Sequence, residues 1–348
     1  MDMQGHGKSR LENGLIYSPT HLELIVTDHC NLNCNACNHA SPLMPAWFAD
    51  PDSVHRSFSI MAKYYRPRFV KVIGGEPLLH KHLGRVVEAA RSTGISDHFT
   101  LVTNGVLLRK ASEAVWQAID EFEVSLYPGV PKTKEDIVFI QEKADALGKK
   151  LTIFSYEQFR ATFSLKGTRD KGLIDKVYAA CKNANVWGCH AIREGYFYKC
   201  PQIIYAAKLT GKSEKTDRIP IVDSDTFQAA LLDYANSSTP PSACAFCTGT
   251  VGIQQPLTQL PREHLSAYID KSLEENIDHD WLARSLTIMD TRDDCKILNR
   301  FKVPRVFDRY PLLKRLISRR YPNFMAQRSL RQKDRPDRKT LAESCLLK

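Results

Sequence analysis

The order of apolar and polar positions predicts short buried strands that alternate with amphipathic helices. Largely apolar, β-branched runs bounded by turn-forming residues are typical of strands. Such runs occupy residues 21–29, 69–75, 98–105, 122–128 and 151–156. Between them, apolar residues recur every three or four positions, which predicts helices in HKHLGRVVEAARSTG, RKASEAVWQAIDEF and KEDIVFIQEKADALGKK.

This alternation predicts an α/β protein built from βαβ units around a parallel sheet. Right-handed crossovers would curl such a sheet into a full or partial (β/α) barrel. The active site of a barrel of this kind lies at the carboxyl ends of its strands. We therefore expect the functional residues of this chain to follow the apolar runs.

The pattern changes after about residue 165. DKGLIDKVYAAC reads as a helix, HAIREGYFYKCPQ reads as a short hairpin that turns at Glu194-Gly195, and cysteines become frequent. We expect a small cysteine-rich domain here, and beyond it a basic, mostly helical or irregular C-terminal extension. The predicted organisation is an N-terminal segment, a barrel, a cysteine-rich domain and an extension, at residues 1–19, 20–165, 166–255 and 256–348.

Composition is that of an ordinary globular protein, with 43% hydrophobic and 25% charged residues among 348. There is no run of eighteen apolar residues and no apolar signal segment at the start, so we expect no transmembrane segment and a cytoplasmic location. The net charge is +10, and residues 300–339 are strongly basic. This stretch is either a solvated tail or a surface for nucleic acid, an anionic membrane or an acidic partner.

The ten cysteines are many for a compartment that keeps thiols reduced, which favours metal binding over disulfides. Eight of them fall in three groups: Cys30, Cys34 and Cys37, then Cys181, Cys189 and Cys200, then Cys244 and Cys247. The first group has the spacing C-x3-C-x2-C, so one loop could bind three irons of a cubane cluster. A zinc ion is the alternative, with His29 or His39 as a fourth ligand.

C-x3-C-x2-C after the first strand, Gly74-Gly75-Glu76-Pro77 after the second and Thr103-Asn104-Gly105 after the third together resemble the radical S-adenosylmethionine (SAM) superfamily. The resemblance implies a partial (β/α)6-type barrel and a [4Fe–4S] cluster on Cys30, Cys34 and Cys37, whose open iron chelates SAM. An electron from the cluster would then cleave SAM to a 5′-deoxyadenosyl radical. It also implies that SAM is contacted by residues at the strand ends, namely Gly74, Gly75, Glu76, Pro77, Asn104 and Ser125. One departure is Ala36, where the family often has an aromatic residue near the adenine.

The later cysteines resemble a second family feature, the shortened SPASM domain known as Twitch. Cys181 is followed by Gly195, then Cys200, then the pair Cys244-x2-Cys247. The resemblance implies an auxiliary [4Fe–4S] cluster on Cys181, Cys200, Cys244 and Cys247. Four thiolate ligands favour a role in electron transfer over a role in substrate binding. Cys189 could replace Cys181, be a thiol near substrate, or be buried, and a zinc site is the alternative for all five.

The predicted function is hydrogen abstraction from a substrate, by an oxidoreductase or maturase of the radical SAM type. A small molecule or carbohydrate is preferred over a peptide, and a reductant such as flavodoxin or ferredoxin is the expected partner. Two alternatives stay open. One is modification of RNA or a nucleotide, which the basic segment favours. The other is a non-catalytic iron–sulfur or zinc-binding protein.

Overall fold

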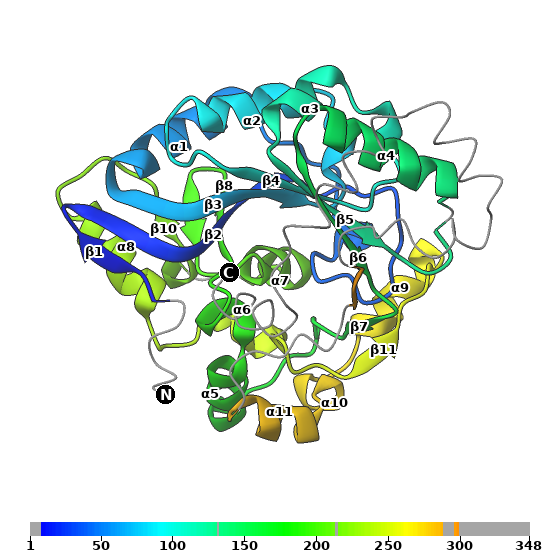
Figure 1. Cartoon of the computed structure of the whole chain (residues 1–348). Helices are drawn as coiled ribbons and strands as arrows, with labels where there is room; N and C mark the ends of the chain where they lie inside the picture. Colours follow the sequence, from blue (N-terminus) through cyan, green and yellow to red (C-terminus); the bar gives the residue numbers. More distant parts are fainter. Residues whose placement is uncertain (1–7, 131, 213–214, 288–295, 299–348) are drawn as a thin grey trace, which may run out of the picture. The chain divides into compact units, whose positions relative to one another are not determined.

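A twisted sheet at the centre of the chain carries the predicted strands (Figure 1). The computed structural model describes residues 8–130, 132–212, 215–287 and 296–298, which belong to one compact unit. The order across the main sheet is β10-β9-β8-β2-β3-β4-β5-β6-β12, with β1 paired to β2. Its strands are β1 (Arg10–Glu12), β2 (Leu15–Thr27), β3 (Tyr65–Gly74), β4 (Phe99–Thr103), β5 (Glu121–Leu126), β6 (Lys150–Ser155), β8 (His190–Arg193), β9 (Tyr196–Tyr198), β10 (Ile219–Pro220) and β12 (Lys296–Leu298).

Strands β2 to β6 are parallel neighbours, as the alternating pattern predicts, and β8 adds a further parallel strand beside β2. Strands β9, β10 and β12 pair antiparallel at the two edges, so the sheet does not close on itself. The predicted α/β partial barrel is thus confirmed. The hairpin of β8 and β9 is confirmed too, with positive φ at Glu194 (50°) and Gly195 (77°) in its turn.

Four helices cover the outer, convex face of the sheet (Figure 1). They are α1 (Pro51–Tyr64), α2 (Leu83–Arg91), α3 (Glu113–Ala118) and α4 (Lys134–Ala146). Helix α2 buries Leu83, Val86, Val87 and Ala90, which share one face at helical spacing. Helix α1 begins where Asp50 accepts a hydrogen bond from the Ser53 amide, ahead of Pro51. The core lies between these apolar faces and the sheet.

Most of the remaining elements lie on the inner side of the sheet (Figure 1). A small second sheet pairs β7 (Gln158–Arg160) with β11 (Gln254–Pro256). The helices here are α5 (Lys171–Ala180), α6 (Lys182–Asn185), α7 (Gln202–Thr210), α9 (Arg262–Ile269), α10 (Leu273–Asn276) and α11 (His279–Ser285). Helix α8 (Phe227–Asn236) instead packs into the main core, where the Phe227 ring contacts Tyr64 of α1. The domain boundary near residue 166 stays a prediction, since β8 lies beyond that point and still joins the barrel sheet.

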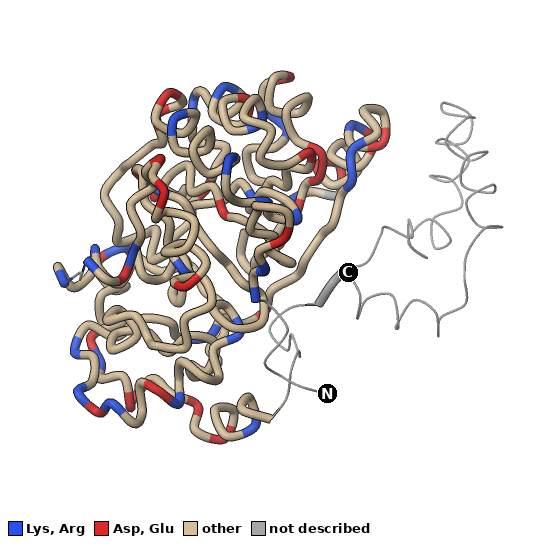
Figure 2. Tube along the Cα trace, turned by 90° about the vertical axis from the view of Figure 1, so that its left-hand side faces the viewer, with Lys and Arg blue, Asp and Glu red and all other residues tan. Residues whose placement is uncertain are grey.

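Charge is mixed along the described chain, where Figure 2 shows Lys and Arg interspersed with Asp and Glu. The basic stretch 300–339, and with it the greater part of the predicted extension, lies outside the described residues. Among the helices that the structure describes, none combines the length and apolar character needed to cross a lipid bilayer.

Candidate active site

The first three cysteines lie in one loop that directly follows β2. Cys34 is buried, while Cys30 and Cys37 are partly exposed. The loop is held by residues 256–260, which run alongside it: the Asn35 amide donates to the Thr258 carbonyl (3.1 Å) and the Leu260 amide to the Asn33 carbonyl (3.0 Å). Gln259 sits between these contacts, donates from Nε2 to Cys34 Sγ (3.1 Å) and accepts from the Asn33 amide (2.7 Å).

These thiols need a cationic partner to ionise. Burial raises the pKa of Cys34 to about 12, with a further contribution from the Cys37 thiolate, and burial likewise raises the pKa of Cys30 and Cys37. An iron–sulfur cluster supplies that positive charge, and thiolates are its usual ligands. The donor set therefore fits a cluster.

The spacing of the sulfurs favours a cluster over a single zinc ion. Ligand atoms on one zinc, each about 2.3 Å away, lie within roughly 4.6 Å of one another. Among the described residues, one group of metal-binding types lies within 4.8 Å of one another, and it contains none of Cys30, Cys34 and Cys37. His39 is outside that group as well, and its Nδ1 donates to the Gly74 carbonyl (2.6 Å).

Gly74 and Gly75 let the end of β3 touch the end of β2 and the start of the cysteine loop. A Cβ on Gly74 would lie 2.2 Å from the Thr27 carbonyl oxygen, and one on Gly75 would lie 2.1 Å from that of His29. Backbone hydrogen bonds fix this approach, from the Gly75 amide to Thr27 and from the Glu76 amide to His29, both at 2.8 Å. No residue with a side chain fits here without moving the loop.

Glu76 ties the GGEP and TNG segments together. Its side chain is fully buried, and its carboxylate accepts from the Thr103 hydroxyl (2.7 Å), the Leu78 amide (3.0 Å) and the Asn104 amide (2.8 Å). Asn104 then donates from Nδ2 to Asn31 in the cysteine loop (2.8 Å). Glu76 thus holds the strand ends in place from behind, as does the buried Pro77, which begins the short turn Pro77–Leu79.

Lys132 completes this support, although nothing in the sequence pattern marked it. Its amine donates to the Asn104 carbonyl and reaches the Ser125 carbonyl at 3.4 Å. Burial lowers the pKa of Lys132 to about 8, and the Glu76 carboxylate opposes this shift. Two strand ends, those of β4 and β5, are therefore joined through one buried amine.

The end of β2 is anchored by a buried ion pair. Asp28 and Arg193 are almost completely shielded from solvent and form a salt bridge, while Lys208 Nζ lies 2.8 Å from the second Asp28 oxygen. The Arg193 guanidinium stacks on Trp47, 3.6 Å from the ring centroid. Because Asp28 lies two residues before Cys30, this anchor sets where the cysteine loop begins.

A cavity of about 290 Å³ opens beside the cysteine loop and extends along the inner face of the sheet. The predicted residues that line it are Cys30, Cys34, Cys37, Gly74, Gly75, Asn104 and Ser125. Glu76 and Pro77 do not line it. Of the predicted SAM contacts, the backbone of the two glycines and the side chains of Asn104 and Ser125 are therefore the groups that a ligand in this cavity can reach.

Deeper in the cavity, the lining is charged. His21 and Glu23 of β2 form a pair (Nε2 to Oε1, 3.2 Å), and Lys71 of β3 pairs with Glu123 of β5 (Nζ to Oε2, 3.0 Å). Burial raises the pKa of Glu23 to about 8, although the nearby Lys71 opposes the shift. The interior of a barrel is ordinarily filled by branched apolar side chains. These charges therefore indicate a site for a polar ligand.

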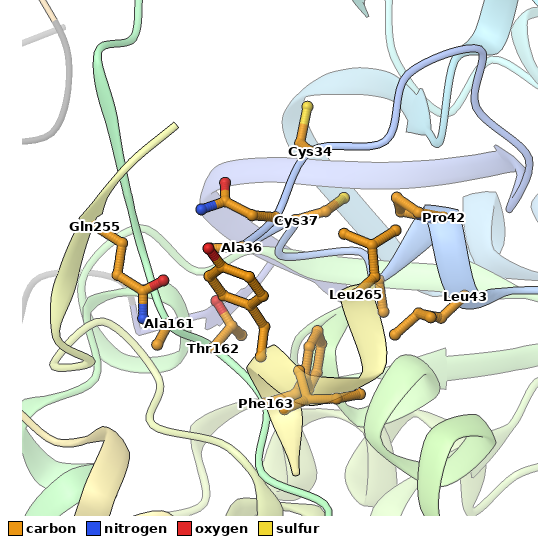
Figure 3. Close-up of a pocket in the computed structure, with 14 residues that line it drawn as sticks. Cys34, Ala36, Cys37, Pro42, Leu43, Ala161, Thr162, Phe163, Gln255 and Leu265 are labelled. Carbon is orange, nitrogen blue, oxygen red and sulfur yellow. The ribbon is translucent and has the colours of Figure 1, made fainter. Parts of the chain in front are cut away.

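A second, apolar pocket lies on the other side of the cysteine loop (Figure 3). It is lined by Ala36 together with side chains of the inner elements, among them Phe163, Leu265 and Tyr268. Its volume is about 20 Å³, which accommodates little more than one water molecule. The small Ala36 therefore does not leave a ready-made space for an adenine ring on this side.

The later cysteines separate into two places. Cys181, Cys200, Cys244 and Cys247 line one small hollow near α5 and α7, and Cys189 is not part of its lining. Burial raises the pKa of Cys247 to about 12 and that of Cys200 and Cys244 well above the usual range, and the neighbouring thiolates add to each shift. Lys199 reaches the carbonyls of Ala235 and Ser237 beside this hollow, and burial lowers its pKa to about 8.

Comparison with known proteins shows that the segment containing the cysteine loop is similar to a known family. Residues 24–137 match the model of the radical SAM superfamily. A GTP 3′,8-cyclase of Mycobacterium marinum is 37% identical over 113 residues, 31% of each chain. A probable GTP 3′,8-cyclase of Methanococcus vannielii is 31% identical over 116 residues, 33% of this chain and 38% of its own. The chain thus matches about a third of the length of these relatives.

Two solved structures are more distantly similar. One is BtrN in complex with AdoMet and 2-DOIA, with 18% identity, a TM-score of 0.41, and coverage of 66% of this chain and 92% of that one. The other is Streptococcus suis SuiB bound to S-adenosylmethionine, with 12% identity, a TM-score of 0.39, and coverage of 76% and 77%.

The fold and the cysteine loop together define an α/β barrel protein with a candidate iron–sulfur site at its strand ends. Residues 24–137, about a third of the chain, are similar to the radical SAM superfamily. The family implies a [4Fe–4S] cluster and SAM as cofactors. The sequence-based recognition of a radical SAM enzyme is therefore confirmed at the level of this domain.

Proposed function

We propose that the chain abstracts hydrogen from a small polar molecule bound in the 290 Å³ cavity beside the cysteine loop. The observation that carries this proposal is that three clustered thiols and the charged inner strands line one cavity. Its size is at the lower end for small-molecule sites. The pairs His21–Glu23 and Lys71–Glu123 can hydrogen-bond hydroxyl or amino groups, which supports a carbohydrate-like substrate over a peptide.

In this proposal, Cys30, Cys34 and Cys37 would hold the catalytic cluster, and SAM would bind beside it in the cavity. When bound, the two cofactors supply the electron transfer and the radical that removes a hydrogen atom. The residues of this chain position them. Gly74 and Gly75 offer backbone groups at the cavity wall, and Asn104 and Ser125 offer polar side chains. Gln259 donates a hydrogen bond to a ligand sulfur, Cys34 Sγ.

We further propose that Cys181, Cys200, Cys244 and Cys247 hold an auxiliary [4Fe–4S] cluster, within a cysteine-rich segment at residues 166–255. Their shared hollow supports this set over one containing Cys189. Four thiolates leave no open iron, which favours electron transfer to or from a reductant such as flavodoxin or ferredoxin. The buried Lys199 amine beside the hollow would partly balance the negative charge of four thiolates.

A second candidate is modification of a nucleotide. The relatives named GTP 3′,8-cyclase favour it, since they are more than 30% identical across the radical SAM domain. The match covers the part that would bind SAM, and about two thirds of each chain lies outside it. The small-molecule proposal therefore rests on the cavity, and the nucleotide candidate rests on the relatives.

To test this proposal, the anaerobically reconstituted protein is incubated with SAM and dithionite, and 5′-deoxyadenosine is measured by mass spectrometry. We expect the product from the wild type and from C244A/C247A, and none from C30A/C34A/C37A. Deuterated amino sugars, polyols and GTP are then compared as substrates, and deuterium in 5′-deoxyadenosine identifies the class that donates hydrogen. A wild-type protein that forms no 5′-deoxyadenosine would contradict the proposal.

A further inference from the structure

Three metal-binding side chains that belong to neither predicted cysteine set meet in the wall of the large cavity. His21 and Glu23 extend from the same face of β2, two residues apart, and Cys189 immediately precedes β8, the parallel neighbour of β2. One ligand atom from each residue lies within 4.8 Å of the other two. The register Leu22↔His190 and Glu23↔Ala191 explains this meeting, because it brings the start of β8 beside the middle of β2.

One atom of this group is buried without a partner. Glu23 is 5% exposed, and while its Oε1 contacts His21 Nε2 (3.2 Å), its Oε2 has no hydrogen bond. A buried carboxylate oxygen without a partner is costly, and nearly all such atoms in folded proteins are satisfied. Glu23 itself is part of the cavity lining, so this unpartnered oxygen belongs to the cavity wall.

Charge and donor type indicate what that ligand is. Imidazole, carboxylate and thiolate together are borderline donors that suit zinc and its neighbours, not magnesium or calcium. With a neutral His21 and with Glu23 and Cys189 ionised, a divalent cation makes the buried group electrically neutral. The distances also fit, because ligands on one zinc ion lie within roughly 4.6 Å of each other.

We propose that His21, Glu23 and Cys189 bind a single divalent transition metal ion of the zinc type, with an open coordination position that faces the cavity. Three protein ligands and one open position are the arrangement of catalytic rather than structural zinc sites. The open position would take a hydroxyl, carboxylate or amine of a small molecule. That last role rests on the proposed function, whereas binding of the metal does not.

Surrounding residues hold the three ligands in place. The Cys189 amide donates to the Asn183 carbonyl (2.9 Å), and the His21 ring lies against Phe69, with centroids 5.4 Å apart. Lys71 also faces this region, but it is paired with Glu123 at 3.0 Å, so its charge is already balanced. Glu123 therefore offers a matched control, as a carboxylate in the same cavity that is outside the three-residue group.

The test uses full-length protein in which both clusters have been reconstituted anaerobically, without SAM or substrate. One equivalent of zinc is added, loosely bound metal is removed with a weak chelator, and zinc is counted by mass spectrometry. Zinc K-edge X-ray absorption then identifies its ligands, since iron does not interfere at that edge. We expect about one zinc per chain, with one sulfur at about 2.3 Å and the other ligands at about 2.0–2.2 Å.

Variants distinguish this site from zinc in an unfilled cluster site. C189S and E23Q should each weaken zinc binding by more than about 100-fold, because a lost ligand costs more than a lost supporting contact. E123Q should retain the zinc. The iron content of each variant checks that it has folded, and the isosteric E23Q carries the test if C189S fails this check. Absence of retained zinc, a spectrum with three or four sulfurs, or zinc retained at full affinity by both variants would overturn the proposal.

Discussion

The close approach of β3 to the cysteine loop predicts a severe effect for Gly75→Ala. The added Cβ would lie 2.1 Å from the His29 carbonyl oxygen, whereas ordinary contacts begin at 3.4 Å. The two backbones would have to separate by about 1 Å, and such a shift in a tightly packed site destabilises the folded state. His29 is next to Cys30, so the displacement would reach the first cysteine of the loop.

The magnitude follows from the contacts that would be lost. Overpacking costs about 1–3 kcal/mol. The hydrogen bonds from the Gly75 amide to Thr27 and from the Glu76 amide to His29 would lengthen or break, at about 1 kcal/mol each. We expect the free energy of unfolding of the apoprotein to fall by about 3–5 kcal/mol.

Urea unfolding of the apoprotein, followed by circular dichroism, measures this loss. Gly172→Ala is the matched control, because Gly172 is exposed near the start of α5 and its Cβ would approach only the Asp170 side chain, at 3.3 Å. Alanine is favoured in helices, so this variant should be neutral or more stable by up to about 1 kcal/mol. Iron content after reconstitution should fall in G75A and not in G172A. Equal stability and equal iron content in the two variants would refute the reasoning.

Three further predictions concern the contacts around the site. Gln259→Leu removes the amide that donates to Cys34, so the reduction potential of the cluster should fall in an EPR-monitored titration, and an unchanged potential would contradict this. Asp28→Asn leaves the buried Arg193 short of its counter-charge and should cost about 3–5 kcal/mol in urea unfolding, part of which D28N/R193M should recover. Burial lowers the pKa of Lys132 to about 8 from 10.5. Between these pH values the unfolded state binds this proton and the folded state does not, so the free energy of unfolding of the wild type should rise with pH there. K132M should lack that gain, and identical pH dependence in the two proteins would argue against it.

The sequence predicted the barrel strands because their apolar runs are dictated by local burial. Strand β5 (Glu121–Leu126) and strand β6 (Lys150–Ser155) begin within one residue of the predicted runs. Strand β2 begins six residues earlier than predicted, at Leu15. Its first part is interrupted by Ser18, Pro19 and Thr20 and is held by pairing with β1 and with Tyr65–Pro67 of β3, which no local pattern reveals.

The site was predictable only where its residues belong to a motif. Gln259 contacts Cys34 across 225 positions of sequence, and Lys132 reaches Asn104 across 28, so their roles depend on the folded chain. The sequence also left Cys181 and Cys189 as alternatives for one ligand. The structure separates them, since they line different cavities.

The first apolar run carries one further local signal. His21 and Glu23 are polar residues two positions apart in the otherwise apolar run HLELIVT. Because alternate residues of a strand share a face, this spacing already indicates a polar pair on one side of the sheet. That the pair faces the inner cavity, and meets Cys189 there, required the register between β2 and β8.

The central claim is that the chain holds two iron–sulfur clusters at two separate sets of cysteines. Counting iron and sulfide per chain after anaerobic reconstitution tests it most directly, in the wild type, in C30A/C34A/C37A and in C181A/C200A/C244A/C247A. We expect about eight irons in the wild type and about four in each variant. If the wild type holds about four irons, and these are lost from the first variant and kept in the second, the chain has no auxiliary cluster. Zinc in place of iron at the first three cysteines would contradict the radical SAM interpretation altogether.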